Sequence, residues 1–83
     1  MRLKGLSKKQ YKAMSTDQGD ACASCNKHKD HQYRDMYIDH DQNTGEVRGL
    51  LCAGCSVALG YSGHNVRTLK LLITYLELHS GKE

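Results

Sequence analysis

The sequence has no Phe, no Trp and few large apolar side chains, which limits the core that a chain of 83 residues can build. Below roughly 80 residues, a hydrophobic core alone rarely supplies more than about 3–5 kcal/mol, so small domains usually add a cross-link. Apolar runs near the ~18 residues needed to cross a bilayer are also missing, and the mean hydropathy is −0.65. This composition excludes a transmembrane span and predicts no membrane partner.

A secretory signal is missing as well, because the basic N-terminus MRLKGLSKKQ is not followed by an apolar segment. We therefore expect a cytoplasmic protein. In that reducing compartment, cysteines bind metals more often than they form disulfides. The four cysteines of the chain are the natural candidates for the missing cross-link.

The formal net charge of +3 is too small to identify a partner, but its distribution is uneven. The first twelve residues contain no acid and five cations, namely Arg2, Lys4, Lys8, Lys9 and Lys12. Such a segment is typical of a nucleic-acid contact, although a solvated helix face or a flexible arm has the same composition.

Local patterns predict a single domain over residues 1–83 with three parts. Residues 1–19 form a basic N-terminal helix that starts after an N-cap at Ser7 and is stopped by Gly19. Residues 20–60 contain two cysteine knuckles and a hairpin, and residues 61–83 form a C-terminal helix. In the middle part we expect strands at 36–40 and 46–51, and then a short helix at 52–59 closed by Gly60 as the residue after its C-cap.

The C-terminal helix carries more apolar positions than a small domain needs. One stripe, which we expect to be buried, consists of Val66, Leu69, Leu72, Ile73 and Leu76, and a second of Leu71, Tyr75 and Leu78. Deeper burial within the domain explains the excess, and so does a contact with a second copy or with a protein partner. Asn65, after His64, is the expected N-cap of this helix.

The spacing of the cysteines is the strongest signal in the chain. Cys22 and Cys25 form one CxxC pair, and Cys52 and Cys55 form a second pair after 26 intervening residues. Four thiolates in two knuckles suit a closed, tetrahedral structural Zn²⁺ site. Two disulfides and an iron–sulfur cluster are the alternatives. A closed zinc site has no open position for substrate, so these residues are expected to hold the fold.

Between the two pairs lie an Asp-His-Asp strand end, a Thr-Gly turn and the run Val-Arg-Gly-Leu-Leu-Cys, followed by the second CxxC and a closing Leu-Gly. In these motifs and their spacing the sequence resembles the recombination endonuclease VII family of phage nucleases, which belong to the HNH or His-metal-finger superfamily. The resemblance implies a small α+β fold: a zinc-stabilised ββα-metal domain with flanking N- and C-terminal helices. It also implies a phage origin, and hence the host cytoplasm.

The resemblance further implies a metal-dependent DNA endonuclease. His40 would be the general base, and Asp39 would ligate a catalytic Mg²⁺ or Mn²⁺. Because neighbouring residues on a strand point to opposite faces, a twist or bulge must bring Asp39 and His40 to one site. Ser56 stands where the family has a metal-binding Asn, and Gln42 stands where it often has a second His.

Arg48 matches a family arginine and is expected to contact phosphate, or otherwise to pair with Asp41 or Glu46 across the hairpin. The full set of expected DNA contacts is Arg48, Lys8, Lys9, Lys12 and Gln42. A role for His64 or Asn65 in replacing the missing family Asn stays open. Two rival functions also stay open: a zinc-stabilised DNA-binding module whose chemistry was lost through Ser56 and Gln42, with Lys4 added to its contacts, and a phage interaction domain that acts on a host protein complex.

Overall fold

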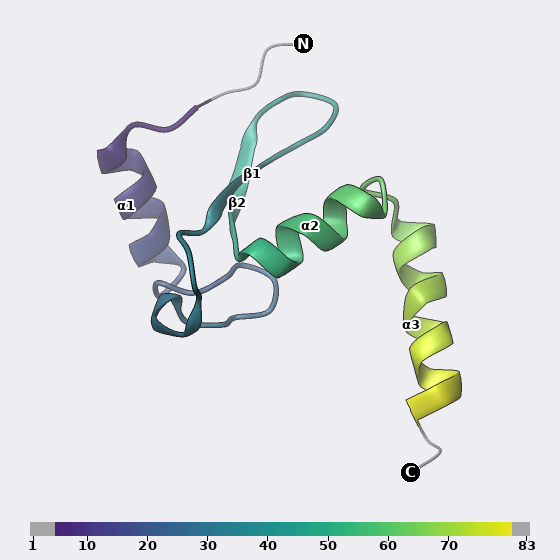
Figure 1. Cartoon of the computed structure of the whole chain (residues 1–83). Helices are drawn as coiled ribbons and strands as arrows, with labels where there is room; N and C mark the ends of the chain where they lie inside the picture. The colour runs from purple at the N-terminus through teal and green to yellow at the C-terminus, as the bar shows by residue number, and fades with distance from the viewer. Residues whose placement is uncertain (1–4, 81–83) are drawn as a thin grey trace.

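A computed structural model describes residues 5–80, which form a small α+β fold of one two-stranded sheet and three α-helices (Figure 1). The elements follow in the order α1 (Lys8–Asp17), a short 3₁₀ turn η1 (Lys29–His31), β1 (Tyr37–His40), β2 (Val47–Leu51), α2 (Ala53–Tyr61) and α3 (Val66–Ser80). The predicted element types are all present. Arg2 and Lys4 of the basic N-terminal segment lie outside the described residues.

Helix α1 begins as its sequence predicts. The Ser7 hydroxyl accepts a hydrogen bond from the Gln10 backbone N–H, and the Gln10 side chain accepts one from the Ser7 backbone N–H. This reciprocal capping box satisfies two N–H groups that the helix cannot pair internally. At the other end, Gly19 adopts a left-handed φ of +69°, which ends the helix.

Gln18, just past the end of α1, fixes this helix to the sheet. Its side-chain oxygen accepts from the Leu50 N–H at 2.9 Å, and its amide nitrogen donates to the carbonyls of Leu50 at 3.0 Å and Ala21 at 2.8 Å. Gly49 leaves the necessary space, because a Cβ at that position would lie 3.2 Å from the Gln18 oxygen. The Tyr11 hydroxyl adds a second link by donating to the Met36 carbonyl at 2.7 Å.

Strands β1 and β2 pair antiparallel with a bulge at the end of β1. Asp39 pairs with Gly49, but His40 pairs with Val47, so Arg48 is the extra residue on β2. The predicted irregularity between Asp39 and His40 is therefore present. In the turn beyond it, the Asp41 carboxylate accepts from the backbone N–H groups at positions 43 and 44. These bonds lower the pKa of Asp41.

Helix α2 is longer than its sequence predicts, because Gly60 lies inside the helix. The residue after the C-cap is Gly63, with a φ of +70°. Its N–H donates to the Gly60 carbonyl at 3.1 Å, and the His64 N–H donates to the Leu59 carbonyl at 3.0 Å. These two bonds form a Schellman motif. The sequence analysis took Gly60 as the residue that ends the helix. A helix can contain a glycine, however, and of the two only Gly63 has the left-handed backbone that ends α2.

Helix α3 is N-capped by Asn65 as predicted, since the Asn65 side chain accepts from the Thr68 N–H at 3.0 Å. The prediction that its main apolar stripe is buried is wrong for this chain. Among the apolar residues of α3, Leu69 alone is half-buried, and the exposed fractions of the other seven run from 52% to 68%. Figure 1 shows the reason: α3 projects away from the rest of the molecule beyond the turn after α2.

The core is centred on the cysteines. Leu50 is fully buried, and Cys22, Leu51 and Cys52 form one cluster with half-buried Cys55 and Leu59 packed against it. So few buried side chains leave much of the stabilisation to the cysteine site. Within residues 5–80, none of the helices combines the length and apolar composition that a bilayer crossing needs.

Candidate functional site

The two CxxC pairs converge on one point. All four cysteines are free, and their sulfur atoms lie within 4.8 Å of one another, with Cys25 and Cys52 at 3.7 Å. Four sulfurs around a tetrahedral Zn²⁺ at about 2.3 Å stand roughly 3.8 Å apart, so the spacing fits one such ion. Because all four cysteines are free, the alternative of two disulfides is not observed.

The backbone is also arranged for thiolate ligands. The Cys22 sulfur accepts from the N–H groups of Ser24 and Cys25, and the Cys52 sulfur accepts from the Cys55 N–H at the start of α2. Such bonds orient and stabilise metal-bound thiolates. The arrangement of these donors and ligands supports a structural zinc site.

The same contacts give the Cys22 and Cys55 thiols different acidities. Burial raises the pKa of Cys22, but backbone N–H groups and the Cys25 thiol outweigh it and lower the pKa to about 6. Burial and hydrogen bonds with the neighbouring thiols raise the pKa of Cys55 to about 12. In this arrangement the Cys22 thiol ionises more readily than the Cys55 thiol.

A second group of polar side chains lies at the bulge, where Arg48 forms a two-pronged ion pair with Asp39. Arg48 Nε is 2.7 Å from one carboxylate oxygen of Asp39, and Nη2 is 3.0 Å from the other. The hydrogen bond with Asp39 is also the largest single reason that the pKa of Arg48 is raised. Arg48 therefore hydrogen-bonds Asp39, and of the two partners expected as an alternative to phosphate, Asp41 contributes a charge interaction that also raises the pKa of Arg48.

His64 joins this group from the turn between α2 and α3. Its Nδ1 lies 3.2 Å from Nη2 of Arg48. One guanidinium therefore connects Asp39 on β1 with His64 in the turn after α2. Sequence analysis left open a role for His64 in place of the missing family Asn, but it gave no sign of a contact with Arg48. Two neighbouring left-handed residues, Gly63 and His64, produce this placement, and a pattern of residue types reveals it poorly.

The other predicted catalytic residues lie on β1 and on α2. His40 follows Asp39 at the end of β1 and is half-buried, and the Gln42 amide donates back to the His40 carbonyl at 3.5 Å. Ser56 is half-buried in the first turn of α2, where its N–H bonds to the Cys52 carbonyl. Within residues 5–80, no hydrogen bond joins Ser56 directly to Asp39.

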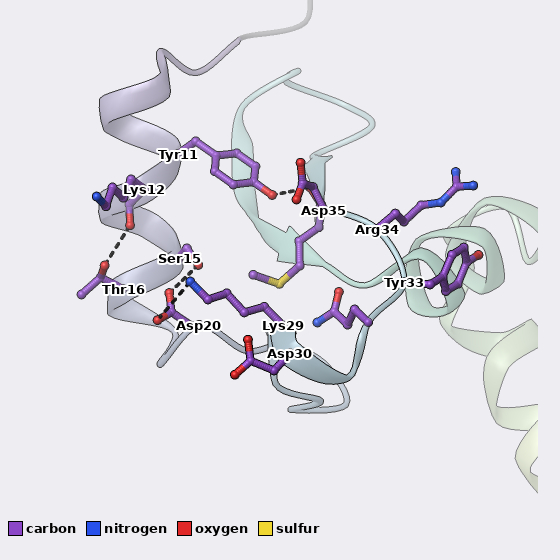
Figure 2. A pocket seen from close by; sticks show the side chains of 12 residues that line it. Tyr11, Lys12, Ser15, Thr16, Asp20, Lys29, Asp30, Tyr33, Arg34 and Asp35 are labelled. Carbon is purple, nitrogen blue, oxygen red and sulfur yellow. Dashed lines mark hydrogen bonds and ion pairs between the residues drawn. The ribbon is translucent and has the colours of Figure 1, made fainter.

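The predicted DNA contacts fall on two elements. Lys8, Lys9 and Lys12 are exposed on α1, whereas Arg48 and Gln42 belong to the hairpin. Lys12 lines a cleft of about 570 Å³ between α1 and the segment before β1 (Figure 2). Charges of both signs line this cleft, including an ion pair between Lys29 and Asp20 at 3.8 Å. None of the predicted catalytic residues lies in it.

Comparison with known proteins assigns the chain to a family. The sequence model of recombination endonuclease VII matches residues 1–78. The Gene 59 protein of Mycobacterium phage D29 is 36% identical over 73 residues, and that of Mycobacterium phage L5 is 34% identical over 73 residues. Each alignment covers 87% of this chain and 44% of the relative, so the chain spans less than half the length of these curated relatives. No solved structure matches it.

Proposed function

The chain belongs to the recombination endonuclease VII family, and we propose that it is a metal-dependent DNA endonuclease that hydrolyses phosphodiester bonds. The observation that carries the proposal is the family match over residues 1–78, which includes the cysteine pairs and the Asp39-His40 strand end. On this proposal β1, β2 and α2 form the ββα-metal unit of the HNH or His-metal-finger nucleases. The relatives are phage proteins, so the expected site of action is the host cytoplasm.

His40 takes the role of general base in this proposal. It accepts a proton from the water that attacks the scissile phosphate. Asp39 would hold Mg²⁺ or Mn²⁺, hard cations that prefer carboxylate oxygens, and Ser56 would contribute from α2. When bound, such a cation would supply positive charge that stabilises the phosphate and the leaving 3′ oxygen. The bulge supports these roles, because strict alternation along β1 would send Asp39 and His40 to opposite faces.

The test is cleavage of supercoiled plasmid by the zinc-loaded protein in Mg²⁺, Mn²⁺ or EDTA. We expect nicking in either cation and none in EDTA. Loss of a general base typically costs 10²–10⁴-fold in rate, so His40→Ala should slow nicking by roughly this factor. His79→Ala, which removes an exposed histidine of α3, is the matched control and should cut normally.

Two other results would replace the proposal. Folded, zinc-loaded protein that binds DNA but cuts it in neither cation would be a binding module, with Ser56 as the first suspect. Such binding should weaken as the salt concentration rises, with a slope set by the number of phosphates that Lys4, Lys8, Lys9, Lys12 and Arg48 neutralise. Protein that does not bind DNA even at low salt would be an interaction domain for a host protein.

We further propose that α3 pairs with α3 of a second copy. Seven of its large apolar side chains are more than half exposed, whereas monomeric proteins seldom expose contiguous apolar patches of this kind. A monomer with one active site would cut one strand, and a dimer would bring two sites to one duplex. A host protein is the rival occupant of this surface.

A further inference from the structure

We infer that His64 is a positioning residue for Arg48: it keeps the guanidinium at the active site when a cation takes the Asp39 carboxylate, so that Arg48 can bind the scissile phosphate. This inference rests on the proposed nuclease function. It explains how one arginine can neighbour a metal-binding carboxylate and still serve the substrate.

The first step is the competition for Asp39. Arg48 occupies both carboxylate oxygens, at 2.7 and 3.0 Å. Each oxygen keeps a further lone pair that a cation can use, but the cation then competes with the guanidinium for the charge of the carboxylate and repels it. An arginine held by Asp39 alone would be loosened by this repulsion, whereas the contact with His64 is a second anchor that the cation does not remove.

The second step is the direction of the hydrogen bond to His64. Arginine has only donors and stays protonated in proteins, so Nδ1 of His64 must be the acceptor in the 3.2 Å contact. The neutral imidazole then carries its proton on Nε2. In this state His64 adds no positive charge beside the guanidinium. It accepts a hydrogen bond from one of the five N–H donors of Arg48 and so anchors the guanidinium.

The third step is the rigidity of His64. Its backbone is left-handed, with a φ of +57°, and its N–H closes the Schellman motif at the end of α2. The next residue, Asn65, caps α3. His64 is thus fixed between two helix ends, and a non-glycine residue in this conformation is uncommon enough to point to a constraint of function.

The fourth step is access. The Arg48 side chain is 41% exposed, whereas that of Asp39 is 14% exposed. The Arg48 side chain is therefore more accessible to a DNA phosphate than the Asp39 side chain is. Planar, forked donors of this kind match two phosphate oxygens at once, which an ammonium cannot do.

The left-handed backbone allows a matched pair of variants. His64→Gly suits the backbone but removes the acceptor. His64→Asn also tolerates the backbone, and its Oδ1 replaces Nδ1 as an acceptor. We expect His64→Gly to lower kcat for plasmid nicking roughly 10–100-fold, the scale of a misplaced catalytic contact, with a smaller change in KM. His64→Asn should restore most of the loss.

A double-mutant cycle tests whether His64 acts through Arg48. In that case Arg48→Gln and the Arg48→Gln/His64→Gly double variant should nick at the same rate. Losses that add independently would overturn the inference, as would full activity in His64→Gly or no recovery in His64→Asn. Circular dichroism and zinc content should be unchanged in every variant.

A binding measurement keeps failure of this inference distinct from failure of the proposed function. In a His40→Ala background with Mg²⁺, we expect His64→Gly to weaken the affinity for a short DNA duplex and His64→Asn to restore it, whether or not the wild type cuts. Equal affinity of all three proteins would overturn the inference, even for a wild type that nicks plasmid.

Discussion

The stability of the core depends on very few side chains, and Leu50 is central among them. It is fully buried on β2, and its backbone N–H and carbonyl both bond to Gln18. Truncating a buried leucine removes transfer free energy and leaves a cavity, which together cost about 2–5 kcal/mol. In a domain this small, such a loss approaches the whole contribution of the apolar core.

We therefore predict that Leu50→Ala lowers the free energy of unfolding of the zinc-loaded protein by about 3 kcal/mol. Val57→Ala is the control, since Val57 is 48% exposed on α2 and its truncation should change stability by less than about 1 kcal/mol. Urea unfolding followed by circular dichroism measures both. Equal losses in the two variants would show that the core is not organised around Leu50.

Single residues also show which parts of the site the sequence could predict. The cysteine site was predictable because the CxxC spacing fixes two local knuckles that fit one metal. A twist or a bulge was expected because neighbouring strand residues point to opposite faces, whereas the roles that the resemblance implies for Asp39 and His40 need both at one site. The contact of Arg48 with His64 was not, because it depends on two left-handed residues after α2 that carry the chain back toward the hairpin.

At the scale of elements, Gln18 replaces the backbone pairing that β2 would otherwise find in a third strand. Its amide satisfies the Leu50 N–H and carbonyl at the outer edge of a two-stranded sheet. Two strands alone are marginal in water, so the docking of α1 on β2 is part of what keeps the hairpin ordered.

We predict that Gln18→Ala costs about 2 kcal/mol of stability, because it leaves the buried Leu50 N–H without a partner. Gln10→Ala, at the exposed capping box of the same helix, should cost less than about 1 kcal/mol. Thermal unfolding of the two variants ranks the sites. A larger effect at Gln10 would contradict the assigned role of Gln18.

The helices differ in how well their sequences predict them. Helix α1 was predicted to within one residue, because Ser7 is a local capping signal. The predicted position of the end of α2 was wrong, because the helix continues until the left-handed Gly63 ends it. The burial of α3 was wrong for a different reason: periodicity identifies an apolar face but carries no information on what covers it.

The exposed face of α3 leads to a prediction about association. Replacing Leu72 and Leu76 by Glu should shift the protein from dimer to monomer in sedimentation equilibrium and leave plasmid nicking intact, while double-strand cuts decline. Replacing the polar Thr68 and Lys70 by Glu is the control and should have a smaller effect on association. A wild type that sediments as a monomer at high micromolar concentration would refute pairing through α3.

At the scale of the whole molecule, the shape departs from that of a compact domain. The radius of gyration is 14.7 Å and the principal extents are 47 × 33 × 18 Å. A compact chain of this length has a radius of gyration of about 12 Å. The excess follows from α3, which extends beyond the core (Figure 1), so apolar burial within one chain is smaller than the sequence suggests.

This limited burial makes the metal decisive for folding. Structural zinc sites contribute about 10–16 kcal/mol in apparent terms, more than the few kcal/mol of a core this size. We predict one zinc ion per chain and loss of secondary structure when a strong chelator removes it, with recovery on adding Zn²⁺. Cys52→Ser should resemble the chelated protein in circular dichroism. A chelated protein that keeps its full spectrum would contradict a structural role for the metal.

The joint at residues 62–65 has a further consequence for the motions of the molecule. Within residues 5–80, α3 meets the core only through this joint, so its backbone amides can open without disturbing the zinc site. An isolated helix of this length is also marginal in water. Amide hydrogen exchange should therefore separate into two classes, slow in the core and fast in α3. A second copy or a partner protein that covers α3 would be detected by slower exchange of the amides of α3.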